Sequence, residues 1–210
     1  MKRYTASSRI FQKQRERKIL KRKKQTKNIL IFIAVIAFFC SIVGLFKVFA
    51  KLGEKIKYPV SYSSYITRYA KENELDPYLV IAMIRQESNF VADARSPYAG
   101  GLMQLTEVTA DEYAKKLGLT DYDYMDPETN IQIGCYVMAS LIDKYDDVDT
   151  ALAAYNAGIG NVDNWLKNPD YSLDGETLYN IPYSETKNYI IKINNYIDEY
   201  KERVDINADI

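Results

Sequence analysis

The sequence contains no histidine, and this absence removes several classes of catalytic site. Ser-His-Asp and Cys-His sites need an imidazole to take the proton from the nucleophile, and many catalytic zinc sites are held by histidine. We therefore expect neither a histidine-activated nucleophile nor a histidine-bound metal. We assign no metal and no cofactor to the chain.

Cysteine is nearly absent as well, with only Cys40 and Cys135 in 210 residues. The two are far apart and show no metal-ligand spacing. Cys40 lies in an apolar run and Cys135 in a predicted helix, so the pattern favours two free thiols over a disulfide.

Acidic side chains are almost absent from residues 1–28, which carry twelve Lys or Arg and only Glu16 as an acid. The other 182 residues carry sixteen basic and twenty-seven acidic side chains, so the formal net charge of zero combines a basic tail with an acidic body. A nucleic-acid-binding arm is one interpretation of this tail. The apolar run that follows favours a cytoplasmic flank instead, and we expect no nucleic acid among the partners.

Charge is also absent from residues 29–46, and the apolar character continues past Lys47 to residue 50. At about 1.5 Å per residue, eighteen uncharged residues nearly cross a hydrocarbon core of roughly 30 Å. The sequence therefore predicts a single transmembrane helix over residues 29–50. The positive-inside rule puts residues 1–28 in the cytoplasm and the body outside the membrane. A cleaved signal peptide and a buried core helix are the alternatives.

Residues 51–60 are expected to form a linker, with Gly53 and Pro59 as helix breakers, and residues 61–205 a helical domain. Asp76 and Asp126 each precede a proline, the signature of a capped helix start, and Ser184 is expected to cap the last helix. We find no convincing hairpin or strand alternation, so the predicted fold is mainly α. The predicted helices cover residues 61–74, 77–89, 106–117 and 150–156, and further helices begin at residues 127 and 184.

Glu87 is the carboxylate that this pattern singles out. Val80, Met83, Ile84 and Glu87 fall on one face of the predicted helix, so Glu87 continues an apolar stripe. Partial desolvation there raises the pKa of a carboxyl group, as a general acid requires at neutral pH. An ion pair with Arg or Lys at the edge of the core is the other interpretation.

Five short motif blocks follow one another along residues 61–200. They are Glu87-Ser88-Asn89-Phe90; Ser96 with Gly101-Leu102-Met103-Gln104 and Thr109-Ala110; Asp126-Pro127 with Asn130-Ile131 and Gly134; Ala154-Tyr155-Asn156-Ala157-Gly158 with Gly160, Val162 and Trp165; and Ile181-Pro182-Tyr183 with Glu185-Thr186 and Tyr189. In these blocks the sequence resembles lytic transglycosylases of the soluble murein transglycosylase (SLT) type, which share a goose-type lysozyme-like fold.

The resemblance implies a helical lysozyme-like domain that cleaves the β-1,4 bond between N-acetylmuramic acid and N-acetylglucosamine in peptidoglycan. Glu87 would be the single general acid/base, and the product would be a 1,6-anhydro sugar. Such an enzyme serves wall remodelling or local wall opening. The partners expected are peptidoglycan strands and, through residues 29–50, the lipid bilayer.

By position in the motifs, several side chains are expected to contact the sugar. The Tyr155 hydroxyl is expected within reach of Glu87. Met103 and Glu185 also have purely structural interpretations: Met103 could fill the core, and Glu185 could be a charge at the start of a helix. The predicted substrate contacts are Ser96, Gln104, Met103, Tyr155, Asn156, Tyr183 and Glu185.

Two departures from the family pattern affect the loop before Gln104. The loop from Ser96 to Gly101 is one residue shorter than usual, and Thr106-Glu107 replaces a Met-Pro pair. The shape of the neighbouring glycan subsite is therefore open. Two functional alternatives also stay open: a glycan-binding or assembly module without turnover, and a muramidase that hydrolyses the same bond.

Overall fold

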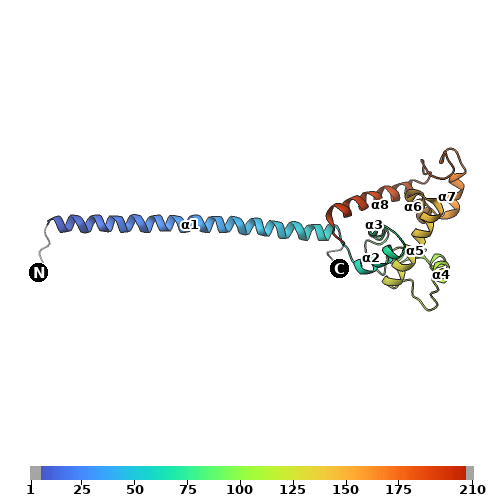
Figure 1. Cartoon of the computed structure of the whole chain (residues 1–210), viewed down its shortest axis with the longest axis horizontal. Helices are drawn as coiled ribbons and strands as arrows, with labels where there is room; N and C mark the ends of the chain where they lie inside the picture. The colour runs from blue at the N-terminus through green and yellow to red at the C-terminus, as the bar shows by residue number, and fades with distance from the viewer. Residues whose placement is uncertain (1–5, 207–210) are drawn as a thin grey trace. The chain divides into compact units, whose positions relative to one another are not determined.

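The computed structural model describes residues 6–206, without the side chains of residues 6–12, 29, 31, 34, 35, 50–52 and 54–56. The chain divides into two compact units, Met1–Ile56 and Lys57–Ile210. Figure 1 shows the elements of each unit along the chain.

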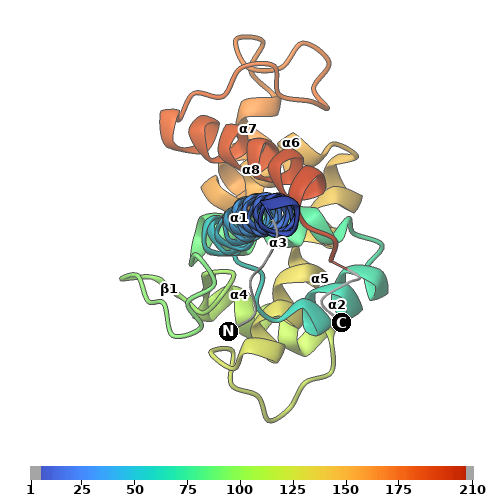
Figure 2. The ribbon, with the colours of Figure 1, turned by 90° about the vertical axis from the view of Figure 1, so that its left-hand side faces the viewer.

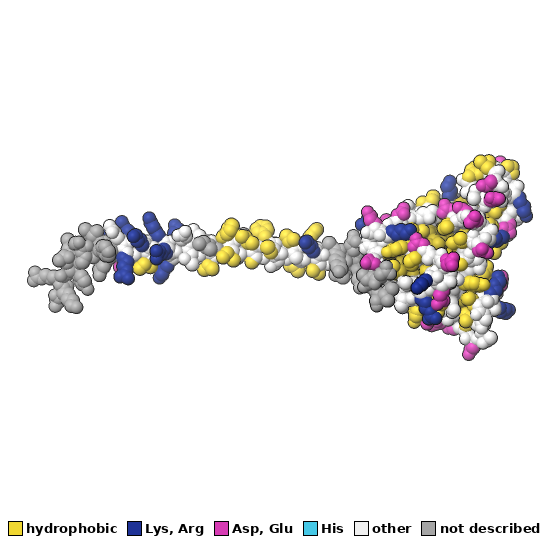
Figure 3. All heavy atoms as spheres, viewed as in Figure 1, with side chains coloured by type: hydrophobic (Ala, Val, Ile, Leu, Met, Phe, Trp, Pro, Cys, Tyr) yellow, Lys and Arg dark blue, Asp and Glu magenta, His cyan; other side chains and the backbone are white. Residues whose placement is uncertain are grey.

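The first unit is built on one long helix, α1, over Ala6–Lys57. Most of its described Lys and Arg side chains lie before residue 28, although Lys47 lies within the later apolar part, and the large apolar side chains described after residue 28 are exposed (Figure 3). The helix runs through Gly53, so the expectation that Gly53 breaks the helix is wrong. A single glycine costs a helix only about 1 kcal/mol, too little to end it.

The predicted transmembrane segment over residues 29–50 lies within α1. Residues 29, 31, 34, 35 and 50 of this segment lie outside the described side chains. In the part of the chain that is described, no helix combines the length and the apolar character needed to cross a membrane.

The second unit is the predicted helical body, and it is mainly α. Helix α3 packs against α8, α5 packs against α6 and α2, and α6 packs against α7. Figure 2 shows α6, α7 and α8 on one side of the unit, and α2, α4 and β1 on the other. The helices are α2 Ser63–Glu72, α3 Pro77–Glu87, α4 Glu107–Lys116, α5 Pro127–Tyr145, α6 Val148–Ala157, α7 Ile159–Leu166 and α8 Ser184–Arg203.

Most of these helices begin where local signals place them. The side chains of Asp76, Thr106 and Asp126 accept hydrogen bonds from backbone N–H groups in the first turns of α3, α4 and α5. These caps satisfy donors that a helix leaves free at its start.

Helix α2 begins at Ser63 rather than at residue 61, the start of α6 also differs from the prediction, and α8 lacks the predicted cap. Helix α6 begins earlier than predicted because Asp147 accepts a hydrogen bond from the Thr150 N–H, while the Thr150 hydroxyl accepts one from the Leu178 N–H. Helix α8 has Ser184 as its first residue and no side-chain cap.

The body also contains a hairpin that the sequence did not predict. Strand β1, Ala99–Gly100, pairs antiparallel with β2, Leu105–Thr106. Strands of two residues are too short to show the alternation that identifies a strand. The loop after Glu87 is therefore tied into a small sheet, and it precedes α4 directly.

Asn130 of α5 holds this hairpin from the interior. Its side-chain oxygen accepts a hydrogen bond of 2.7 Å from the Met103 N–H, and its amide nitrogen donates to the carbonyls of Gly100 (3.2 Å) and Tyr124 (2.7 Å). Asn130 is fully buried, and the three bonds use its donors and an acceptor. Gly101 leaves room for it, because a Cβ there would lie 2.1 Å from the Asn130 amide nitrogen.

Gly101→Ala should lower the free energy of unfolding by about 3 kcal/mol. The change adds left-handed strain, at a φ of 80°, to a clash with a buried amide. Gly118→Ala is the matched control, since φ is 73° there and nothing lies within 4 Å of the added Cβ, so about 1 kcal/mol is expected. Urea unfolding followed by Trp165 fluorescence measures both, and equal losses would contradict the Asn130 contact.

Candidate active site

Glu87 is the last residue of α3 and lies at the edge of the core. Val80, Met83 and Ile84 below it on the same helix are fully buried, and Glu87 itself is half-buried. Burial raises the pKa of Glu87 from about 4.5 to about 7, because the charged form loses solvation. A carboxyl group with this pKa holds a proton in a large fraction of molecules at neutral pH.

Tyr189 of α8 is the hydrogen-bond partner of Glu87. Its hydroxyl donates to Glu87 Oε1 at 2.7 Å, and this bond moves the pKa of Glu87 downward, against the larger effect of burial. Burial, and next the charge of Glu87, raise the pKa of Tyr189 well above its usual range, so Tyr189 stays an O–H donor. Because the bond stabilises the carboxylate, Tyr189 favours the state that follows proton donation.

Tyr189 belongs to the last motif block, but no role was predicted for it. The signal for it was available in the spacing of the last helix. Tyr189 lies four residues after Glu185, so the two share one helix face, and a substrate contact at Glu185 would direct Tyr189 towards the same site. Its pairing with Glu87 joins residues 102 positions apart, which spacing within one helix does not reveal.

Tyr155 was expected within reach of Glu87, but its hydroxyl forms a hydrogen bond with a different partner. The Tyr155 hydroxyl donates to the backbone carbonyl of Met103 at 2.8 Å, which connects α6 to the hairpin. Burial and then the charge of Glu87 raise the pKa of Tyr155 well above its usual range. The charge of Glu87 therefore acts on Tyr155, while the Tyr155 hydroxyl donates its hydrogen bond to the Met103 carbonyl of the hairpin.

Ser96 and Gln104 bond to the hairpin's own backbone. The Gln104 amide nitrogen donates to the carbonyls of Ala94 (3.1 Å) and Gly101 (2.9 Å). The Ser96 hydroxyl donates to the Ala99 carbonyl at 3.3 Å and accepts from the Ala99 N–H at 3.0 Å. Both side chains shape the loop beside Glu87, and their contacts with sugar stay predictions.

The Met103 side chain has no exposed surface. A Cβ on Gly134 of α5 would lie 2.3 Å from the Met103 sulfur, so the thioether fills the space that this glycine leaves. The expected substrate contact by Met103 is corrected on this ground: the structure makes it a core residue. Its backbone carbonyl, which accepts from Tyr155, is the part that serves the site.

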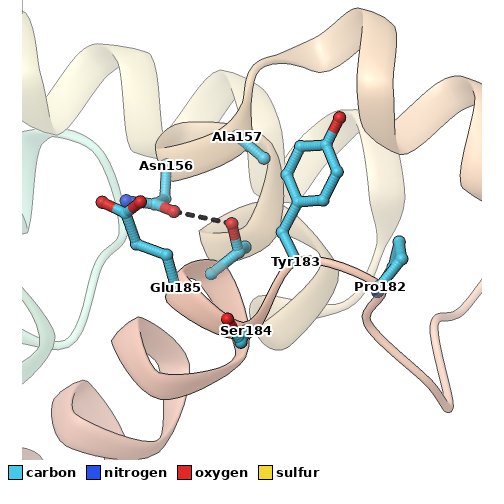
Figure 4. Close-up of a pocket in the computed structure, with 7 residues that line it drawn as sticks. Asn156, Ala157, Pro182, Tyr183, Ser184 and Glu185 are labelled. Atoms are coloured by element: carbon cyan, nitrogen blue, oxygen red, sulfur yellow. Dashed lines mark hydrogen bonds between the residues drawn. The ribbon is translucent and has the colours of Figure 1, made fainter.

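The remaining predicted residues meet at a pocket of about 520 Å³ between the end of α6 and the start of α8. Figure 4 shows the Glu185 carboxylate directed towards the Asn156 side chain. The Thr186 hydroxyl donates to Asn156 Oδ1 at 2.8 Å. The lining residues are Asn156, Ala157, Pro182, Tyr183, Ser184, Glu185 and Thr186, and Glu87 is not among them.

Tyr183 forms one wall of this pocket and is half-exposed. Its ring packs edge-to-face on Trp165 of α7, with the ring centroids 4.9 Å apart, so Trp165 supports Tyr183 from behind. Trp165 itself is buried, as a packing residue would be. The pocket thus offers one aromatic ring, one carboxylate, one amide and hydroxyl groups to a polar ligand.

Metal ligands do not gather at this site. Across the described residues, no group of three or more Cys, Asp or Glu side chains is arranged to hold an ion. The chemistry that the arrangement supports is proton transfer by one half-buried carboxyl group, Glu87.

Tyr189→Phe should raise the pKa of Glu87 further, because the variant loses a bond that favours the carboxylate. A hydrogen bond to a charged group is worth about 1.5–3 kcal/mol, so the rise should be roughly one to two pH units. A carbon-13 NMR titration of the Glu87 carboxyl group measures it. Tyr145→Phe is the control, since that hydroxyl bonds Asp163 instead. An unchanged pKa in Tyr189→Phe would show that the bond has no influence.

Comparisons with known proteins agree with this geometry. Residues 64–177 match the family model described as Transglycosylase SLT domain. The chain is 33% identical over 152 residues to the soluble lytic murein transglycosylase of Salmonella typhimurium, covering 69% of this chain and 24% of that protein. It is 39% identical over 107 residues to the membrane-bound lytic murein transglycosylase F of Desulfosudis oleivorans, covering 46% and 22%.

A solved structure shares the fold. An inactive Glu-to-Gln mutant of the lytic transglycosylase Slt from Pseudomonas aeruginosa superimposes with a TM-score of 0.63 at 31% identity, over 71% of this chain and 25% of that one. The chain thus spans about a quarter of the length of these relatives. The family match covers more than half of the chain, and its helical body has the lysozyme-like fold of these structures: the chain belongs to the transglycosylase SLT-domain family.

Proposed function

We propose that this chain is an enzyme that cleaves the glycan strands of peptidoglycan, with Glu87 as its single general acid/base. The observation that carries the proposal is a half-buried carboxyl group whose pKa is raised to about 7. The relatives support the reaction class, since those named above are lytic murein transglycosylases. The inactive relative carries a glutamate-to-glutamine change, which fits a glutamate as the essential group.

The proposed reaction uses Glu87 twice. Protonated Glu87 donates its proton to the oxygen of the β-1,4 bond between N-acetylmuramic acid and N-acetylglucosamine, and the bond from muramic C1 to that oxygen breaks. The resulting carboxylate takes the proton of the muramic C6 hydroxyl while O6 bonds to C1. Glu87 ends protonated, the muramic residue becomes its 1,6-anhydro form, and no water is consumed.

The surroundings of Glu87 suit both steps. A pKa of about 7 makes the acid form common and the base form accessible, which is the compromise that general acid–base catalysis needs. The Tyr189 hydroxyl stabilises the carboxylate between the two transfers. Since the first step needs the proton, the rate should fall as pH rises through about 7.

Substrate binding is proposed to use the pocket between the end of α6 and the start of α8. Asn156, Glu185 and Tyr183 line it, and an aromatic ring with polar neighbours is a common combination for a sugar ring with its hydroxyl and acetamido groups. Ser96, Gln104 and Tyr155 are proposed to border the same cleft from the hairpin and α6. This proposal gives no substrate contact to the Met103 side chain.

We further propose that residues 29–50 anchor the enzyme in a membrane, with residues 1–28 in the cytoplasm and the body facing the wall. The support is the run of eighteen uncharged residues behind a block of twelve Lys and Arg. A relative with the same domain is described as membrane-bound. Such an anchor would confine cleavage to wall near the bilayer, for remodelling or local opening.

Glu87→Gln should lower the release of soluble fragments from purified peptidoglycan by at least about a hundredfold, because glutamine cannot exchange the proton. Asp93→Asn is the matched control: Asp93 is the next carboxylate along the chain, is exposed, and should leave release unchanged. Fragment release by the full-length variants is measured by chromatography of the soluble products. If Glu87→Gln released fragments at the wild-type rate, the enzyme would not work through Glu87.

The non-catalytic alternative makes a different prediction. It would be favoured if the wild-type protein released no fragments and still sedimented with peptidoglycan. Release of fragments that end in reducing muramic acid would instead favour the hydrolysing muramidase.

The anchor is tested by carbonate extraction of membranes from a bacterial host that expresses the full chain. We expect wild type to stay in the membrane, and Ile36→Lys with Val43→Lys to be released, since each central charge costs about 2.5–3.5 kcal/mol. Leu173→Lys with Val108→Lys, at exposed apolar positions of the body, should stay membrane-bound. Extraction of the wild-type chain would contradict the anchor, and a product that begins beyond residue 50 would favour the cleaved signal.

A further inference from the structure

Arg85 lies two residues before Glu87 on α3 and contacts two segments on either side of that helix. Its Nη2 donates to the backbone carbonyl of Lys57 at 3.3 Å, and its Nη1 donates to the Asn89 side-chain oxygen. Its guanidinium carbon also lies 5.9 Å from the centroid of the Tyr196 ring of α8. A guanidinium has several N–H donors in one plane, which allows one side chain to bond both segments.

The first of these segments, residues 57–60, is fastened to the body. The buried Tyr58 ring packs edge-to-face on Tyr200 of α8, with centroids 5.6 Å apart. The Tyr200 hydroxyl donates to the Pro59 carbonyl at 2.9 Å. Both contacts involve the fully buried Tyr200. The Lys57 carbonyl that Arg85 bonds therefore belongs to a segment that is packed firmly against α8.

The second segment is the turn that directly follows Glu87. Asn89 and Phe90 both have left-handed backbone conformations, with φ of 51° and 63°. Such conformations cost roughly 1–2 kcal/mol for residues other than glycine, with asparagine the better tolerated of the two. The turn is also held by the buried Phe90 side chain and by a bond from the Val91 N–H to the Ser88 carbonyl. The Arg85 hydrogen bond is thus a further restraint on this turn. It acts on Asn89, which is the strained residue nearest to Glu87 in the chain.

We propose that Arg85 is a positioning residue: it fastens the strained turn after Glu87 to residues 57–60 and so keeps the Glu87 carboxyl in its desolvated place. This inference rests on the proposed function of Glu87 as the acid/base. It also gives residues 57–60, the last part of the predicted linker, a part in the site. Arg85 acts through the backbone and touches no substrate in this account.

The alternative route from Arg85 to Glu87 is its positive charge. The causes that set the pKa of Glu87 are burial and the Tyr189 hydrogen bond, and Arg85 is not among them. The groups that face Glu87 are Tyr189 from α8 and Tyr155 from α6, both of which stay neutral. Geometry rather than charge is therefore the route, and variants can separate the two.

The test compares full-length wild type with Arg85→Met, Arg85→Lys, Asn89→Gly and the double variant Arg85→Met with Asn89→Gly. Glycine adopts a positive φ without strain, so Asn89→Gly keeps the turn without needing Arg85. We expect Arg85→Met to lower kcat roughly tenfold or more at unchanged KM, as a misplaced catalytic group does. Lysine keeps the charge but has no fork of donors, so Arg85→Lys should lose most of the same activity.

Rescue is the sign of a positioning role. In the Asn89→Gly background, Arg85→Met should cost less than about twofold, because the turn no longer depends on the contact. The high-pH limb of the rate profile should also move to lower pH in Arg85→Met, since a looser turn admits water and lowers the pKa of Glu87. Arg68→Met is the matched control: Arg68 forms exposed ion pairs with Glu72 and Glu128, and its loss should change neither quantity.

A carbon-13 NMR titration measures the pKa of Glu87 in the same variants, and it tests the positioning role without relying on turnover. We expect the pKa of Glu87 to fall in Arg85→Met and to return towards the wild-type value in the double variant. An unchanged pKa and an unchanged kcat in Arg85→Met would overturn the proposal, as would an equal loss in the Asn89→Gly background. A wild-type protein without activity but with the expected titration shifts would sink the proposed function and leave the positioning role standing.

Discussion

The hydrogen bond from Tyr189 to Glu87 joins α3 to α8 at the edge of the core. A carboxyl group in that place has two opposing requirements. It must be shielded from water enough to keep its proton near neutral pH, and it must have a partner for the charge that appears when the proton leaves. Burial on the apolar stripe of α3 meets the first requirement, and the Tyr189 hydroxyl meets the second. The contact between α3 and α8 depends on the helices packed around it. Much of the body therefore helps to position Glu87 and Tyr189.

The hairpin after Glu87 is held from three directions. Asn130 bonds its backbone from within the core, Tyr155 bonds the Met103 carbonyl from α6, and the Gln104 amide closes it on itself. Gln104 also has a positive φ of 47°, as do Asn89 and Phe90 in the turn after Glu87. Strained backbone near a proposed reaction centre is kept only where surrounding contacts fix it. The hairpin contacts hold Gln104, while the Arg85 hydrogen bond and the buried Phe90 side chain hold the turn at Asn89 and Phe90.

Local signals carried most of the fold prediction. The caps at Asp76, Thr106 and Asp126 act within one turn, so the sequence identifies them directly. The same holds for Glu87, because its position on an apolar stripe depends only on helical spacing. The errors have local reasons too: Gly53 costs α1 too little to end it, and strands of two residues show no pattern.

The site's partners were harder to predict because they depend on the packing of distant segments. Nothing near Tyr189 in the sequence shows that its hydroxyl reaches Glu87, and nothing near Met103 shows that Gly134 makes room for its sulfur. Gln104 was expected to bond sugar, yet its amide nitrogen bonds two backbone carbonyls whose positions only the folded loop defines. Motif resemblance located these residues at the site without revealing which atoms face the ligand.

The central claim is that one carboxyl group performs both proton transfers and that water takes no part in the chemistry. Digestion of peptidoglycan by the full-length protein in oxygen-18 water, followed by mass spectrometry of the fragments, tests it most directly. The account predicts 1,6-anhydro muramic ends that carry no heavy oxygen. Reducing muramic ends that have each gained one oxygen-18 atom would contradict it, because a water molecule would then have replaced the C6 hydroxyl as the attacking group.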